Sequence, residues 1–222
     1  MKISNSFIVF LRKKKITILY FISCYVSRIV FFAYMVLIAK ILGPVNYGLL
    51  SIFALSLRYT DFLHLGFCNA LTKEVSFFRG RGNFAKIDEI RGVVFSSILI
   101  IAAFVSITIC TISTLSLAKI GINMAVTFYL LALIIILQQI DNYFNFYFFA
   151  DRNFNAISVS RICAVLIVGT IMVISTVMFN FMGLLPGFLL GSIIFLLYIY
   201  KKYHPLIKFN VCFKKSIALI KV

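Results

Sequence analysis

The sequence predicts an all-α polytopic membrane protein, a bundle of six transmembrane helices. Of its 222 residues, 63% are hydrophobic and only 13% are charged, whereas a soluble domain carries about 25% charged residues. The mean hydropathy is +1.08. The apolar residues are gathered into runs that match the roughly 20 residues a helix needs to cross a bilayer. Together these observations exclude a soluble protein.

The order of the runs gives the expected domain organisation. Gly43-Pro44 separates the first run from the second, because this dipeptide ends one helix and opens a tight turn. Residues 162–200 lack charge and would measure about 58 Å as one helix, so the run must fold back, and we place its reversal at 180–187. Residues 73–91 are typical of a loop with a short amphipathic helix. The expected segments are a basic cytoplasmic N-terminus at 1–15, spans at about 16–39, 46–72, 92–118, 124–150, 155–179 and 184–200, and a basic interfacial cytoplasmic tail at 201–222.

The second apolar run carries three polar residues that are candidates for a functional site. Arg58, Asp61 and His64 stand at i, i+3 and i+6, which places them on one broad face of a helix. A charge at bilayer depth costs about 2.5–3.5 kcal/mol on insertion scales, so such residues usually face protein or water. Arg58 and Asp61 could partly neutralise each other at this spacing. His64 is either a hydrogen-bonded packing residue or a proton relay.

Two other spans supply candidate substrate-pathway residues. Arg28, near the middle of the first span, is either a structural cation, with Asp141 as a candidate partner, or a cation that lines a cavity for an anionic substrate. The fourth span carries a polar stripe that either holds helices together by hydrogen bonds or forms a wall facing water or sugar. The charge of Asp141 favours the wall. The stripe consists of Gln138, Asp141, Asn142 and Asn145.

Composition also argues against other functions. The net charge of +16 does not indicate nucleic-acid binding, because the cations lie in short blocks between apolar runs. The six acidic residues have no metal-like spacing, and no nucleotide loop or nucleophile motif is present. We therefore expect no enzymatic activity, no metal and no cofactor. The acidic residues are Asp61, Glu74, Asp88, Glu89, Asp141 and Asp151.

Four stretches resemble a known family. Residues 39–49 read AKILGPVNYGL, 65–74 read LGFCNALTKE, 150–154 read ADRNF and 214–221 read KKSIALIK. In this order they resemble the first lobe of the Wzx-type polysaccharide or O-antigen flippases, in the multidrug/oligosaccharidyl-lipid/polysaccharide exporter superfamily. The resemblance implies a substrate, an undecaprenyl-pyrophosphate-linked oligosaccharide. It also implies a step, the transfer of this substrate across the bacterial inner membrane for lipopolysaccharide O-antigen or capsule biosynthesis.

The resemblance covers one lobe of a two-lobe exporter. We therefore expect a truncated or half-size flippase that meets lipid-linked oligosaccharide and membrane lipids, and that pairs with a second copy or a separately encoded second lobe. Two alternatives stay open. One is a multidrug or small-molecule exporter of the same superfamily, although two central arginines disfavour cationic cargo. The other is a non-transporting membrane interaction protein or an inactive remnant.

The distribution of cations predicts the orientation. If the N-terminus is cytoplasmic, the inside segments hold 18 lysines and arginines and the outside connections hold two, Lys40 and Lys119. Cytoplasmic loops carry such an excess, so both termini are expected inside. Cysteine labelling at these two positions and at Lys201 tests this. Positions 40 and 119 should be labelled from outside and 201 from inside, and cytoplasmic access to position 40 would contradict the topology.

Overall fold

The computed structural model describes the backbone of residues 2–116 and 121–203 and the side chains of 18–116, 121–122 and 124–203. This part of the chain consists of helices and short turns without a strand, which confirms the predicted all-α fold class. The elements are α1 (Lys2–Thr60), the short 3₁₀ helix η1 (Asp61–His64), α2 (Phe67–Gly80), α3 (Phe84–Leu115), α5 (Ile122–Ala150), α6 (Phe154–Phe179) and α7 (Phe181–Tyr203). Residues 204–222 of the expected tail lie outside the described residues.

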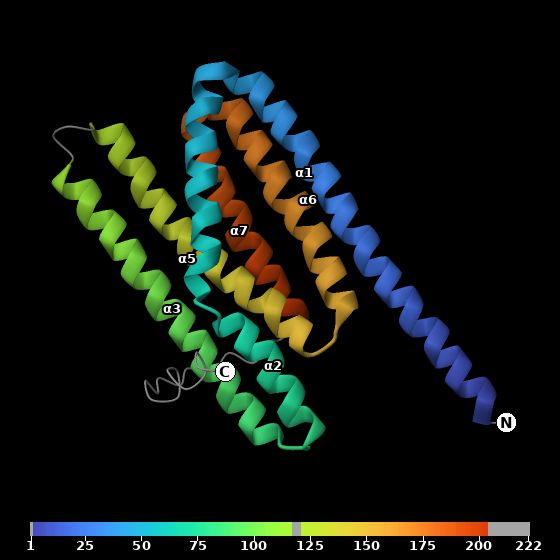
Figure 1. Cartoon of the computed structure of the whole chain (residues 1–222). Helices are drawn as coiled ribbons and strands as arrows, with labels where there is room; N and C mark the ends of the chain where they lie inside the picture. The colour runs from blue at the N-terminus through green and yellow to red at the C-terminus, as the bar shows by residue number, and fades with distance from the viewer. Residues whose placement is uncertain (1, 117–120, 204–222) are drawn as a thin grey trace.

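The first helix, α1, reverses its direction in the middle. Gly43 has φ 72° and ψ 175°, outside the helical region, and Pro44 opens the second half, where its fixed φ suits a first helical turn. Figure 1 shows the two halves of α1 running in opposite directions along the bundle. The predicted Gly-Pro turn therefore lies at one end of the molecule.

The described chain has five helices that are long and apolar enough to cross a membrane. The first of them, Ile18–His64, contains the reversal at Gly43 and passes along the bundle twice. The chain is therefore a multi-pass membrane protein. We call the end that holds the turns after α2 and α5 the hairpin end, and the end that holds the reversal of α1 and the turn between α6 and α7 the reversal end (Figure 1). Gly43 and Asn180 belong to these two reversals.

The expected single helix over 46–72 is wrong. α1 ends at Thr60, η1 follows, and the chain then turns through Leu65 (φ 42°) and Gly66 (φ 83°) before α2 begins. The backbone is left-handed at both turn residues, which interrupts the helix even though the sequence stays apolar. The three polar residues of this stretch therefore do not share one continuous helical face.

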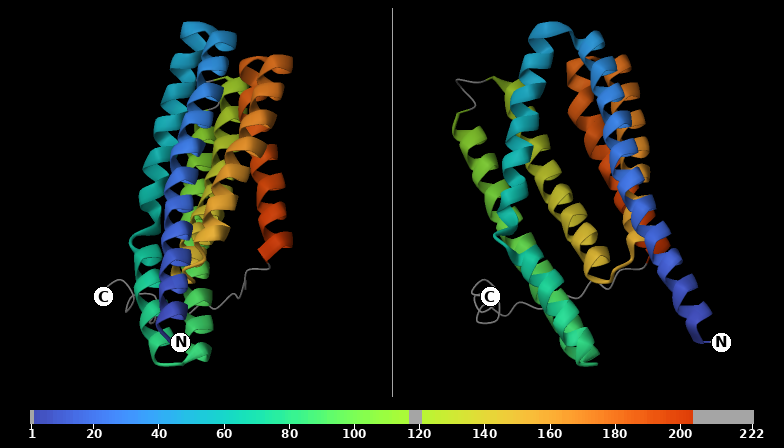
Figure 2. Two further views of the ribbon diagram at one scale, coloured as in Figure 1. Left: turned by 90° about the vertical axis from the view of Figure 1, so that its right-hand side faces the viewer. Right: turned by 45° about the vertical axis from the view of Figure 1, so that its right-hand side comes forward.

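The expected loop at 73–91 is mostly helical. α2 continues to Gly80 and α3 begins at Phe84, where the Asn83 side chain accepts a hydrogen bond from the Lys86 N–H and caps the helix. Both views in Figure 2 show this α2–α3 hairpin extending beyond the turn between α5 and α6. The third helix consequently begins well before the expected start at residue 92.

The last reversal is tighter than expected. The chain turns at Asn180 (φ 51°), and the glycines and proline of 183–187 lie inside α7. A Cβ added to Gly187 would lie 2.6 Å from the Ser175 Cβ, and one added to Gly191 would lie 2.9 Å from the Val168 Cα. These glycines therefore allow α7 to approach α6 closely, as small residues do between membrane helices.

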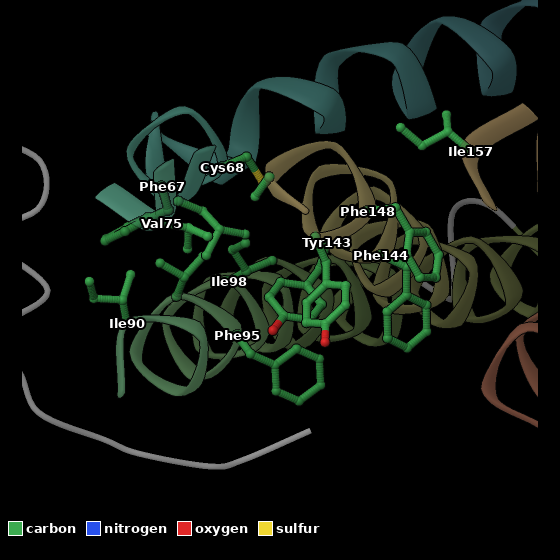
Figure 3. Packing of buried hydrophobic residues seen from close by; sticks show 14 of the residues in the cluster. Phe67, Cys68, Val75, Ile90, Phe95, Ile98, Tyr143, Phe144, Phe148 and Ile157 are labelled. Atoms are coloured by element: carbon green, nitrogen blue, oxygen red, sulfur yellow. The ribbon is translucent and has the colours of Figure 1, made fainter. Parts of the chain in front are cut away.

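The largest core cluster joins α2, α3 and α5 near the hairpin end (Figure 3). Tyr143 is fully buried, and its ring centroid lies 4.8 Å from that of Phe95. Cys68 is also fully buried in this cluster, which makes it a packing residue. A second cluster, around Ile38, Ile134 and Leu184, lies towards the reversal end.

Candidate functional site

A groove of about 420 Å³ lies between the two halves of α1, η1, α5, α6 and α7. A second cavity of about 180 Å³ adjoins it between α1, α5, α6 and α7, and both are lined by Phe31, Gln138 and Asp141. The second cavity is otherwise almost entirely apolar. The polar lining of the groove consists of Arg58, Asp61, Gln138, Asp141 and Asn142.

The groove brings together five of the eight predicted site residues, and the other three lie elsewhere. Arg28 is exposed one turn before Phe31, on the helix face that Phe31 shares with the groove. His64 packs its ring edge-on against Phe146, with centroids 5.8 Å apart. Asn145 donates to the backbone carbonyl of Asp141 at 3.0 Å, within its own helix.

The two arginines of α1 lie at one depth. Arg28 precedes Gly43 by 15 residues and Arg58 follows it by 15. At a rise of 1.5 Å per residue, both are about 22 Å from the reversal, in the half of the bundle nearer the hairpin end. Both side chains are exposed in the chain by itself.

The acidic partners predicted for these arginines are not found. No ion pair joins Arg58 to Asp61, or Arg28 to Asp141, among the side chains that the structure describes. Amides hold Asp61 instead: its Oδ1 accepts from Gln138 Nε2 at 2.8 Å and from Asn142 Nδ2 at 3.3 Å. The groove thus has a carboxylate fixed by α5 beside a guanidinium that it does not neutralise.

α5 also donates to the backbone where the second pass breaks. Gln139 Nε2 donates to the Thr60 carbonyl at 2.6 Å. The Leu57 carbonyl accepts from Thr60 Oγ1 at 2.6 Å and, at 3.4 Å, from Gln138 Nε2. The sequence did not single out Gln139, which is fully buried. The feature that could have identified it is a second amide side chain beside Gln138 in an otherwise apolar helix.

The break itself is strained. Leu65 adopts a left-handed conformation that costs a side chain of this size about 1–3 kcal/mol. The Gly66 N–H donates to His64 Nδ1 at 3.3 Å, which closes the turn locally. Hydrogen bonds from α5 to Thr60 and Asp61, and from the Gly66 N–H to His64, therefore hold the chain on both sides of Leu65.

Arg161 is a further cation inside the bundle. It is half-buried on α6, donates to Cys24 Sγ at 3.1 Å, and lies over the Tyr20 ring at 5.5 Å. The sequence predicted it only as a cytoplasmic cation, because its contact with Cys24 joins residues 137 positions apart.

An ion-pair cluster closes the hairpin end. Asp151, which follows α5, accepts from Arg79 of α2 and, at 2.5 Å, from Arg91 Nη2 of α3. Arg79 also donates to the Ala150 carbonyl at 3.2 Å, and Arg91 lies over the Tyr147 ring at 4.3 Å. The Arg91 side chain is only 9% exposed. This cluster fixes the α2–α3 hairpin to the end of α5.

The described residues contain no group of three or more His, Cys, Asp or Glu side chains that could hold a metal ion. The family model described as "Polysaccharide biosynthesis protein" matches residues 14–221. Searches of curated proteins and of solved structures each found no match.

Removing the shared carboxylate should destabilise the protein. Asp151→Asn leaves the buried Arg91 without its closest anion, and we expect a loss of about 3 kcal/mol in unfolding free energy. Denaturant or thermal unfolding in detergent measures the change. Asp88→Asn is the control, because Asp88 is 34% exposed and approaches Arg91 only to 4.0 Å. Equal losses in the two variants would show that Asp151 does not hold the cluster together.

Proposed function

The chain belongs to the polysaccharide biosynthesis protein family, and we propose that it takes part in moving a lipid-linked oligosaccharide across the bacterial inner membrane. The polar groove between α1 and α5 would hold the headgroup. The specific cargo we propose is an undecaprenyl-pyrophosphate-linked glycan for O-antigen or capsule biosynthesis. Both termini would lie in the cytoplasm, which makes the hairpin end the cytoplasmic end.

The observation that carries this proposal is the exposed Arg58 in a groove whose other polar lining consists of amides and carboxylates. Guanidinium groups suit phosphate, because their N–H donors match its oxygens in pairs. Gln138, Asn142 and Asp141 supply the donors and acceptors that sugar hydroxyl groups require. A headgroup with a diphosphate next to a sugar fits this combination.

The depth of the arginines suits loading from the cytoplasmic leaflet. Arg28 and Arg58 lie about 22 Å from the reversal end, so both are in the cytoplasmic half of the bilayer core in the proposed orientation. A headgroup entering from that side would meet them first, while its hydrocarbon chain stays in the bilayer. The sugar would then contact the amides of α5.

The groove also needs a second wall. Arg28, Arg58 and Asp61 are exposed in the single chain, and each charge in contact with lipid would cost about 2.5–3.5 kcal/mol. Membrane transporters commonly hold their substrate between two repeats. We infer that a second copy of the chain, or a separately encoded second lobe, covers this face and completes the pathway.

Arg58→Ala should abolish polysaccharide export in the strain that carries the protein, because the groove loses its cation. Surface polysaccharide is measured by immunoblotting together with the amount of the protein in the membrane. Arg81→Ala is the matched control, since it removes an exposed arginine on the α2–α3 hairpin, away from the groove. Normal export by the Arg58 variant at normal protein level would contradict the proposed site.

A second wall can be detected by cross-linking. In a cysteine-free background, Tyr59→Cys places a thiol beside Arg58 at a position that is 66% exposed. A short bis-maleimide should link it to a cysteine-bearing partner, either a second copy or a co-purified second lobe. Ile107→Cys on α3, which is 62% exposed, should remain unlinked. Equal cross-linking at both positions, or none at Tyr59, would count against a wall over the groove.

A further inference from the structure

We propose that residues 61–66 are a two-state hinge, broken as observed or continuous with α1 and α2. The side chains that hold its broken state belong to α5 and partly line the groove. Groove occupancy and the shape of the second pass would therefore be coupled. The coupling rests on the proposed function, whereas the hinge itself does not.

The two states differ in the backbone of two residues, and the change between them would move α2 within the core that it shares with α3 and α5. Asp61–His64 already forms a 3₁₀ helix, and Thr60 has right-handed values of φ −69° and ψ −17°. Only Leu65 and Gly66 are left-handed between α1 and α2. Returning these two residues to the right-handed region would produce the continuous helix that the apolar sequence of 46–72 favours.

The α5 amides add hydrogen bonds to the broken state. Gln139 donates to the Thr60 carbonyl at 2.6 Å, and Gln138 and Asn142 donate to the Asp61 carboxylate. In the continuous state the Thr60 carbonyl would accept from the His64 N–H within the helix, so it keeps the partner that a membrane environment requires. The α5 amides are therefore the groups that favour the broken state.

Two of these α5 amides also line the groove. Gln138 and Asn142 line the groove and also hold the Asp61 carboxylate. A ligand that takes hydrogen bonds from these amides would release Asp61 and remove one of the donors to Leu57, which favours the continuous helix. A ligand shifts such an equilibrium only by its differential binding to the two states, and this competition supplies the difference. Arg79 of α2 forms an ion pair with Asp151. A change to the continuous helix would therefore also displace the ion-pair cluster at the hairpin end.

The sequence allows a direct measurement at the hinge. His64-Leu65 is the only His-Leu pair among the 222 residues, so labelling His with carbonyl ¹³C and Leu with ¹⁵N reports on one amide. NMR of the whole protein in nanodiscs would then show left-handed and helical forms of Leu65 as separate or averaged resonances. In the parent protein the left-handed form should dominate.

Gly66→Ala isolates the backbone effect, because a Cβ at Gly66 meets nothing within 4 Å while φ 83° disfavours alanine. It should raise the ratio of helical to left-handed Leu65 by about fivefold or more. Gln139→Ala should move it in the same direction. Leu65→Asn, read through the His-Asn pair, should increase the left-handed share, because asparagine tolerates that conformation. Gly48→Ala also places its Cβ in open space, but at an ordinary helical φ, and should change nothing.

An unmoved Leu65 resonance in both Gly66→Ala and Gln139→Ala would overturn the hinge, provided that the Gly48→Ala protein gives the parent spectrum. Inorganic diphosphate separates the hinge from the coupling. It should shift the parent protein towards the helical form and should not shift Arg58→Ala. Binding of diphosphate by calorimetry without a shift would overturn the coupling alone, and absence of binding would count against the proposed anion site.

Discussion

Every peptide group inside a bilayer needs a hydrogen-bond partner from the protein, and the break in the second pass is the place where this requirement is hardest to meet. The α-helix ends at Thr60, in a segment that is otherwise apolar, and a 3₁₀ helix follows it. Gln139 donates from α5 to the Thr60 carbonyl, and Gln138 donates more weakly to the Leu57 carbonyl. The position of α5 relative to α1 is thereby set by backbone hydrogen bonding rather than by apolar packing alone.

α5 serves two structural purposes with different faces. Tyr143 and Tyr147 pack into the core that α2 and α3 share, and Asp151 at its end holds two arginines. Gln138, Asp141 and Asn142 instead face the groove. A helix built in this way connects the ion-pair cluster at one end of the bundle with the groove near its centre, and both depend on its orientation.

The sequence was sufficient for the fold class, because hydrophobicity and run length decide whether a helix enters a membrane. It also singled out the polar residues that line the groove, since Arg58, Asp61, Gln138, Asp141 and Asn142 stand out against apolar neighbours. It could not locate the break at 61–66. The apolar pattern there is continuous, and Leu65 is a residue that seldom adopts a left-handed conformation.

Long-range partners were also beyond the sequence pattern. Asp151 pairs with residues that precede it by 72 and 60 positions, and no spacing rule connects them. Asp61 was expected to pair with Arg58 one turn away, yet the amides of α5 hold it. In the same way, the reversal after α6 was placed too broadly, because Gly183 and Gly187 serve close packing with α6 and do not form a turn.

The reversal at Gly43-Pro44 bears on how the protein reaches the membrane. The two halves of α1 are joined without any polar loop. No soluble segment therefore separates the insertion of the first half from that of the second. In the proposed orientation the halves would enter together as a helical hairpin, with the reversal leading. Arg28 and Arg58 are equally far from that leading edge and would cross the insertion machinery side by side. During biosynthesis, two positive charges would therefore enter the hydrocarbon before α5 has been made. A delay between the insertion of α1 and its packing against α5 would leave both charges in lipid.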